Sequence, residues 1–579
     1  MAEREENMIR GSVQSVVFQN PENGYAVLRL QTDEGEAVTV VGTIPMTVVG
    51  ERLVVVGRWG HHASHGRQFE AEFLERLMPE TTGEIYAYLS SRAIKGIGER
   101  TAAKIMELFG TQALNVIENE PERLEVISGI SHRRAMEISE SFRKQAGVRR
   151  LIEFLTLHRL PAELAVRLYR VYGDMAADAL RDDPYLLTGP YFGADFSVVD
   201  AFALEMDVEA DDERRVEAGV LFELSYNLGN GHTFIPQDKL IAATAALLSL
   251  PHETIAAALD RLCEQQRMER DTIAGLTACY LPEFYEAETY VARRLLQMAG
   301  VTLPEPARLE QILRGVEAAS GMQYAEKQRQ AIRDAAVNRL LLVTGGPGTG
   351  KTTVMTAILD LFDRMGLKTQ LAAPTGRAAK RLGEVTGREA STIHRLLEAQ
   401  FDPETGMMSF FHDEDEPLRC DAMIVDETSM VDLQLMLSLL RALKPQCRLI
   451  LVGDPDQLPS VGAGNVFSDI IRSGVAKTVR LTEIFRQAQE SLIVMNAHAV
   501  NRGELPVLTV KDRDFFFMKR RSGESVVQTI AELCATRLPK NMHIPPEDIQ
   551  VLSPTRRHET GTQSLNRALQ AVLNPPAQG

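Results

Sequence analysis

A glycine-rich segment in the middle of the chain has the residue types and spacing of a phosphate-binding loop. It follows the apolar run 340–343, precedes a helical pattern at 354–362, and reads Gly345-Gly346-Pro347-Gly348-Thr349-Gly350-Lys351-Thr352-Thr353. Glycines permit the tight turns that point backbone N–H groups at a polyphosphate, and the new helix adds its positive N-terminal end. We expect Lys351 to reach the β- and γ-phosphates and the Thr352 hydroxyl to bind Mg²⁺. The segment therefore predicts binding of a nucleoside triphosphate.

Other polar residues stand where they would complete such a site. Asp426 and Glu427 follow a buried strand predicted at 422–425, where they suit the Mg²⁺ shell and a general base for the attacking water. Gln457 follows the next strand and is placed to sense the γ-phosphate, and Arg486 is a candidate arginine finger. Gln328, one helix before the loop, has an amide that both donates to and accepts from adenine. Alone, Arg486 would be a surface ion pair and Gln328 an ordinary helix residue.

Length and composition indicate the class of protein that positions these residues. At 579 residues the chain predicts three to five domains. With 44% hydrophobic and 25% charged residues it is typical of a globular protein, and no apolar run approaches the length of a bilayer, so we expect no membrane partner. The net charge of −16 argues against a surface coated by nucleic acid but permits a local basic channel. Five scattered cysteines without metal-ligand spacing indicate free thiols in a reducing cytoplasm.

The first domain, residues 1–78, is predicted to be a small β-barrel. Strand-like segments at 9–13, 25–30, 37–41 and 52–56 are separated by turn residues. An OB-like barrel is the type that we expect, although other small barrels share this pattern.

Residues 79–212 are predicted to be helical and contain an internal repeat. Gly96 and Gly98 in the first copy align with Gly129 and Ser131 in the second, at a constant offset of 33 residues. Each copy resembles the helix-hairpin-helix motif, whose turn offers backbone N–H groups to a DNA phosphate without reading sequence. Gly96, Gly98 and Gly129 are the candidate contacts. The alternative is that the copies are packing units that do not touch DNA.

Three further domains are predicted. Residues 213–305 combine helices with a short β-like segment in a winged-helix-like order. Residues 306–490 are expected to form an α/β domain around the phosphate loop, with an inserted hairpin at 399–418. Residues 491–579 form the last region.

Five motifs in order resemble those of superfamily 1 helicases. They are Gly-Gly-Pro-Gly-Thr-Gly-Lys-Thr-Thr, Ala-Pro-Thr-Gly-Arg-Ala-Ala, Val-Asp-Glu-Thr-Ser-Met, Gly-Asp-Pro-Asp-Gln-Leu-Pro-Ser-Val and Leu-Thr-Glu-Ile-Phe-Arg-Gln. The variants are similar to those of the RecD-like family. The barrel, the repeats and the winged-helix-like region resemble its stand-alone branch, which works without RecB and RecC.

The resemblance implies an ATP-dependent helicase that moves 5′ to 3′ on single-stranded DNA and parts duplex at single-strand/duplex junctions. It assigns Gln328 to adenine, Thr352 and Asp426 to Mg²⁺, and Lys351, Asp426, Glu427, Gln457 and Arg486 to catalysis. Gly346, Pro347, Gly348, Thr349, Gly350, Lys351, Thr352 and Thr353 would bind the phosphates of ATP. Pro374, Thr375, Arg377 and His394 match positions that line the DNA track, and the 399–418 hairpin would part the strands. A cytoplasmic monomer acting in DNA repair, recombination or replication is expected.

The resemblance implies that residues 306–490 are a RecA-like α/β motor domain and that residues 491–579 begin a second, incomplete RecA-like domain, with a strand at 552–555. The chain departs from the family pattern after residue 555. It ends before a Val-His-Lys-Ser-Gln-Gly-type motif and a final arginine-bearing motif, which predicts a C-terminally truncated family member. An alternative function is therefore a DNA-binding, ATP-responsive module without unwinding activity. A phosphate-loop NTPase that acts on another substrate is a third interpretation.

Overall fold

The computed structural model describes residues 7–19, 25–44, 47, 49–62, 66–77, 81–90, 94, 96–401, 408–483, 490–510 and 512–575. The chain divides into two compact units. One unit contains Met1–Ala307, Asp334–Leu342 and Phe362–Thr478, and the other contains Arg308–Arg333, Val343–Leu361 and Val479–Gly579.

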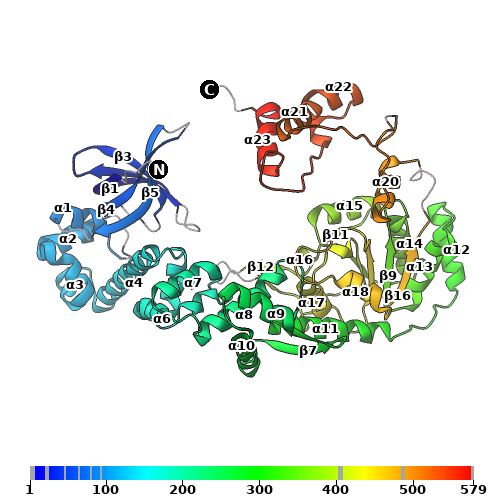
Figure 1. Cartoon of the computed structure of the whole chain (residues 1–579), viewed down its shortest axis with the longest axis horizontal. Coiled ribbons are helices and arrows are strands. Elements are labelled where there is room, and N and C mark those ends of the chain that lie inside the picture. Colours follow the sequence, from blue (N-terminus) through cyan, green and yellow to red (C-terminus); the bar gives the residue numbers. More distant parts are fainter. Residues whose placement is uncertain are drawn as a thin grey trace. The chain divides into compact units, whose positions relative to one another are not determined.

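The N-terminal strands close into a five-stranded barrel, drawn in blue in Figure 1. Their order around the barrel is β1-β2-β3-β5-β4, and β4 pairs with β1. Side chains alternate between the two faces of the strand: Ala26, Leu28 and Leu30 of β2 face the core, while Tyr25 and Arg29 face outward. The OB-like barrel predicted from the sequence is confirmed. The strands are β1 (Asn7–Gln19), β2 (Tyr25–Thr32), β3 (Ala37–Thr43), β4 (Arg52–His62) and β5 (Gly66–Leu77).

Helices α1 to α4 contain the internal repeat. Ile94 and Ile127 begin the two copies, Ile105 and Ile138 end them, and all four side chains are buried in one core cluster. The repeat therefore places equivalent side chains at equivalent positions in a shared core. The helices are α1 (Thr82–Ser90), α2 (Glu99–Phe109), α3 (Ala113–Asn119) and α4 (His132–Leu157).

The next region is helical and ends in a winged-helix arrangement. Helix α8 is followed by β6, two helices and the hairpin β7–β8, and the three strands form a sheet in the order β6-β8-β7. The elements are α5 (Leu164–Tyr172), α6 (Ala176–Asp182), α7 (Phe196–Glu205), α8 (Glu213–Leu228), β6 (Ile235–Pro236), α9 (Gln237–Leu248), α10 (His252–Glu264), β7 (Glu269–Ile273), β8 (Leu276–Tyr280) and α11 (Pro282–Ala299).

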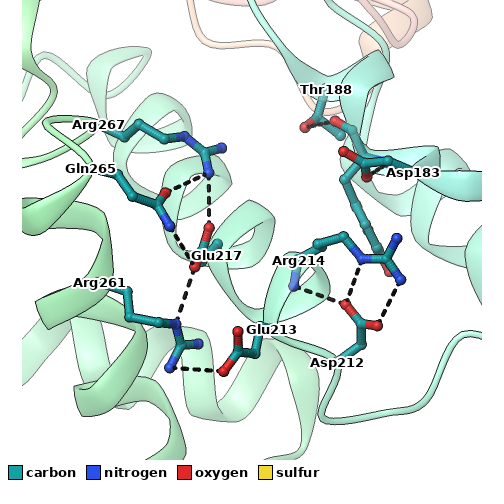
Figure 2. A network of polar contacts seen from close by, with 10 residues as sticks. Asp183, Thr188, Asp212, Glu213, Arg214, Glu217, Arg261, Gln265 and Arg267 are labelled. Carbon is teal, nitrogen blue, oxygen red and sulfur yellow. Dashed lines mark hydrogen bonds and ion pairs between the residues drawn. The ribbon is translucent and has the colours of Figure 1, made fainter. Parts of the chain in front are cut away.

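A buried carboxylate with two more exposed arginine partners joins elements of this helical region. Glu217 of α8 accepts hydrogen bonds from Arg267 at 2.8 Å, Arg261 at 3.2 Å and Gln265 at 3.4 Å (Figure 2). One buried carboxylate thus holds α8 against the end of α10 and the residues that follow it, and its charge is compensated by two guanidinium groups.

A second buried cluster joins α7 to α8. Arg215 donates to both carboxylate oxygens of Asp200, at 2.8 and 3.0 Å, and to the Ala210 carbonyl at 2.6 Å. The Tyr185 hydroxyl donates to Asp200 at 2.7 Å. Burial and the Asp200 carboxylate raise the pKa of Tyr185, so the hydroxyl remains a donor.

The α/β domain is built on a six-stranded sheet of order β11-β10-β14-β15-β9-β16. Strand β14 is buried along its length and pairs in parallel with β10 and β15, which explains its continuous apolar sequence. The strands are β9 (Leu340–Gly345), β10 (Thr369–Ala373), β11 (Ala390–Thr392), β14 (Ala422–Val425), β15 (Arg448–Gly453) and β16 (Lys477–Leu481). The helices are α13 (Glu326–Val337), α14 (Lys351–Arg364), α15 (Gly376–Thr386), α16 (Ile393–Leu396), α17 (Leu433–Ala442) and α18 (Val466–Ser473).

The predicted insertion is a β-hairpin in the residues that the structure describes. Strands β12 (Ala399–Phe401) and β13 (Met408–Phe410) pair antiparallel, and residues 402–407 lie outside the described residues.

The prediction of a strand at 552–555 is wrong. In the described residues from 490 to 575 there are helices but no strand, and Leu552 is 84% exposed. A strand needs a partner, whereas here Ser553 donates to the Thr560 carbonyl at 2.8 Å and closes a local turn. The helices are α20 (Leu492–Asn501), α21 (Gly523–Glu532), α22 (Leu538–Met542) and α23 (Thr562–Leu573).

Among the described helices, none is by itself long and apolar enough to cross a membrane. The bent pair α9 and α10 is long and apolar enough only when the two helices are taken together, and its apolar residues, such as Leu240 and Leu259, belong to the core of the winged-helix region.

Candidate functional site

The glycine-rich loop lies between β9 and α14, as predicted. Gly348 and Gly350 have φ angles of +76° and +81°, which L-residues rarely adopt. The Thr349 hydroxyl donates to the Gly346 carbonyl at 2.9 Å, and Lys351 Nζ donates to the carbonyls of Gly345 and Gly346 at 2.5 and 3.2 Å. The ammonium group is thus held at the loop itself. Thr352 and Thr353 lie in the first turn of α14.

Gln328 of α13 is only 4% exposed. Its Oε1 accepts from the Ala325 N–H at 3.1 Å, while its Nε2 is buried without a partner among the described residues. A buried donor without an acceptor costs free energy, and a ligand that supplies an acceptor removes that cost. The orphaned amide therefore has the chemistry that an adenine ring would satisfy.

The two carboxylates stand at the end of β14. Asp426 accepts from the Glu427 N–H at 2.9 Å, and its own N–H donates to the Ala372 carbonyl at 3.0 Å. Glu427 has a left-handed backbone, with φ +52° and ψ +40°. That conformation costs a residue with a Cβ about 1–2 kcal/mol, and such strain concentrates at functional sites.

A cavity of about 530 Å³ adjoins Glu427. It brings together two groups of predicted residues: Thr375 and Arg377, expected on the DNA track, and Glu427 and Gln457, expected to act in hydrolysis. The lining residues are Thr375, Arg377, Ala378, Lys380, Arg381, Glu384, Glu427, Met430 and Gln457. Pro374, His394 and Asp426 are outside this lining.

Lys380 and Arg381 are basic lining residues that the sequence predictions did not name. Together with Arg377 they occupy positions i, i+3 and i+4 of α15, which is the spacing of one helix face. That spacing is a signal in the sequence from which they could have been found. Thr375 caps the helix by accepting from the Ala378 N–H at 3.3 Å.

His394 lies apart from this cavity. It sits on α16, and its ring centroid is 5.9 Å from that of Phe410 on β13. Arg486 lies outside the described residues.

The two repeat turns share a local conformation. Gly96 and Gly129 have φ angles of +97° and +100°. Gly98 has an extended φ of −115° and an open space at its Cβ position, so a side chain fits there. Ser131, its counterpart, uses its side chain as the N-cap of α4 and accepts from the Arg134 N–H at 3.4 Å. Serine is therefore compatible with this position.

Together, the barrel, the helical repeats, the winged helix and the phosphate-loop domain describe a multidomain, nucleotide-dependent enzyme of the DNA-helicase class. Three family models match the chain. They are the OB-fold domain of the ATP-dependent DNA helicase YrrC at residues 6–79, the HHH domain of the ATP-dependent RecD2 DNA helicase at 144–234 and an AAA domain at 328–463.

The chain is 31% identical to the ATP-dependent RecD2 DNA helicase of Deinococcus radiodurans, over 99% of its own length and 79% of that protein. It therefore belongs to the RecD2 helicase family and is an ATP-dependent DNA helicase that hydrolyses ATP. It is also 39% identical to the RecBCD enzyme subunit RecD of Mycolicibacterium smegmatis, over 31% of this chain and 36% of that subunit. The crystal structure of the Pif1 helicase from Candida albicans aligns with a TM-score of 0.27 and 20% identity, over 37% of this chain and 55% of that one.

Proposed function

We propose that this enzyme moves 5′ to 3′ on single-stranded DNA, driven by Mg²⁺-ATP, and opens duplex at single-strand/duplex junctions. The observation that carries the proposal is the cavity beside Glu427, where basic residues of α15 line the same space as the candidate hydrolytic residues. DNA that binds in this shared cavity lies beside the residues proposed to act in ATP hydrolysis, so that DNA binding affects the rate of hydrolysis directly. The polarity is supported by the RecD-type variants of the motifs.

On this proposal the nucleotide is bound at its two ends. The buried Gln328 amide donates to the adenine ring, and the loop N–H groups, Lys351 and the N-terminus of α14 bind the phosphates. Gly346, Pro347, Gly348, Thr349 and Gly350 provide the backbone of that cradle.

The Thr352 hydroxyl and the Asp426 carboxylate would hold Mg²⁺, which prefers oxygen ligands of these kinds. When bound, Mg²⁺ neutralises charge on the phosphate oxygens. Glu427 takes a proton from the attacking water, and its fixed backbone orients the carboxylate. Gln457 and Arg486 sense the γ-phosphate and stabilise the charge that develops on it.

DNA contacts fall into two sets. Thr375, Arg377, Pro374 and His394 belong to the track for single-stranded DNA, and the 399–418 hairpin parts the strands. The repeat turns at Gly96, Gly98 and Gly129 bind phosphates without reading sequence. We also propose a cytoplasmic monomer with a role in DNA repair, recombination or replication. All five cysteines are free thiols, which supports a reducing compartment.

The test is ATP hydrolysis with and without single-stranded DNA, followed by unwinding of duplexes with a 5′ or a 3′ single-stranded tail. The wild type should be stimulated by DNA and should unwind only the 5′-tailed duplex. Lys351→Ala and Glu427→Gln should each lower kcat by about 100-fold or more. Glu427→Gln should still bind ATP, whereas Lys351→Ala should bind it weakly.

Each alternative has its own outcome. Unwinding of the 3′-tailed duplex overturns the proposed polarity. DNA-stimulated hydrolysis without any unwinding favours the DNA-binding, ATP-responsive module. Stimulation by RNA or protein but not by DNA overturns the assignment of the DNA track.

A further inference from the structure

The imidazole of His498 lies against the phosphate loop. His498 is in α20, and its Nε2 is 3.1 Å from the Pro347 carbonyl oxygen in the same compact unit. A carbonyl oxygen only accepts hydrogen bonds, so Nε2 carries the proton and donates it. The loop is thereby linked to a residue that lies 151 positions further along the chain.

The contact explains the glycine at position 346. A Cβ added there would lie 2.5 Å from His498 Cε1, and its three nearest heavy atoms all belong to the imidazole. The φ of Gly346 is outside the left-handed region, so backbone conformation does not demand glycine. A side chain at position 346 would therefore have to displace the His498 ring from the space that it occupies.

Helix α20 is anchored at two points beside His498. The Ser491 hydroxyl donates to Asp514 at 2.5 Å at the start of the helix. Asn496 is buried and exchanges two hydrogen bonds with the backbone of Val507, at 2.8 and 3.0 Å. The backbone of Val507 and the Asp514 carboxylate therefore hold the helix that presents the imidazole.

We propose that His498 is a positioning residue that sets the orientation of the phosphate loop for ATP. In a trans peptide unit the C=O and the N–H point in opposite directions. A Pro347 carbonyl held toward His498 therefore turns the Gly348 N–H to the other side, into the phosphate cradle. The inference rests on the proposed nucleotide site, and it makes the affinity of that site depend on α20.

The experiment compares His498→Ala, His498→Gln and His498→Phe in the full chain. It measures the dissociation constant of a fluorescent ATP analogue, the KM for ATP and kcat. His498→Ala should raise the dissociation constant and KM by about 5–10-fold, as expected from loss of one hydrogen bond, and leave kcat within about twofold. His498→Gln, which keeps a donor, should recover most of the affinity, and His498→Phe, which keeps only the ring, should not.

A double-mutant cycle tests the steric half of the proposal. Gly346→Ala displaces the imidazole, so it should weaken nucleotide binding about as much as His498→Ala. The double variant should bind no more weakly than His498→Ala alone. Val500→Ala, an exposed position on α20, is the control and should match the wild type.

Three results would overturn the proposal: unchanged affinity in His498→Ala, equal recovery by His498→Phe and His498→Gln, or additive losses in the cycle. A variant that lowers the melting temperature and kcat together but leaves affinity unchanged points to general support of the fold, which also overturns it. Because affinity is measured without turnover, absence of hydrolysis in the wild type would refute the proposed function and leave this test intact.

Discussion

Arg134 Nη2 lies 3.0 Å from the carbonyl oxygen of Gly96, and Nη1 of the same guanidinium lies 3.3 Å from that of Gly129. One side chain at the start of α4 therefore ties together the two glycine turns of the repeat. The turns that we propose as phosphate contacts are consequently held in a fixed relationship, although they are far apart in sequence.

Arg134→Ala should loosen both turns and weaken duplex DNA binding about fivefold, since two backbone carbonyls lose their donor. Arg133→Ala is the matched control, because Arg133 is exposed and pairs with Glu137 one helical turn away. Fluorescence anisotropy with labelled duplex at several salt concentrations measures the effect. Equal losses of DNA affinity in the two variants would show that Arg134 contributes only as a surface charge.

Gln328→Glu should raise the KM for ATP about tenfold and leave the KM for GTP nearly unchanged. The new carboxylate still accepts from the Ala325 N–H but offers adenine no donor. Steady-state hydrolysis with both nucleotides measures the change. Gln330→Ala, on the same helix, should behave as wild type. A parallel rise for ATP and GTP would mean that Gln328 does not contact the base.

Asp200→Ala should destabilise the helical region by about 3–5 kcal/mol, because it leaves the buried Arg215 guanidinium, in a side chain only 7% exposed, without its carboxylate. Asp178→Ala removes the carboxylate of an exposed pair with Arg181 and should cost less than about 1 kcal/mol. Chemical unfolding followed by circular dichroism compares the two. Similar losses for both variants would contradict the structural role given to the buried cluster.

Glu288→Gln should stabilise the protein at neutral pH but not in acid. Burial raises the pKa of Glu288 above its ordinary value, while hydrogen bonds from Tyr280 and Thr233 oppose the rise. The folded state thus binds the proton more tightly than the unfolded state. The contribution of Glu288 to stability is full below its unfolded pKa and is lost as the pH rises through the folded pKa.

Glutamine mimics the protonated acid at every pH, so the difference in melting temperature between variant and wild type should grow from about pH 4 to pH 8. Thermal unfolding across that range measures it. A constant difference would show that Glu288 does not titrate with a raised pKa.

Much of this architecture was predictable because it depends on local patterns. The alternation of buried and exposed side chains in β2, the continuous apolar sequence of β14 and the glycines of the phosphate loop can each be recognised within a few residues of sequence. The internal repeat could be recognised because its two copies begin with equivalent residues, Ile94 and Ile127, which are buried in the same core.

What could not be predicted depends on chain segments that meet only in the folded protein. Nothing near His498 indicates that it faces Pro347, and nothing near Arg134 indicates that it reaches Gly96. The strand predicted at 552–555 failed for the same reason, since an extended sequence becomes a strand only where a partner lies beside it.

The left-handed backbone of Glu427 has a consequence for protein engineering. Glycine adopts that conformation without penalty and asparagine with little, so a screen for heat tolerance would favour either residue at this position. If Glu427 activates water as proposed, the variants selected for robustness would be those that had lost ATP turnover. Thermal selection on this enzyme therefore needs a simultaneous selection for hydrolysis.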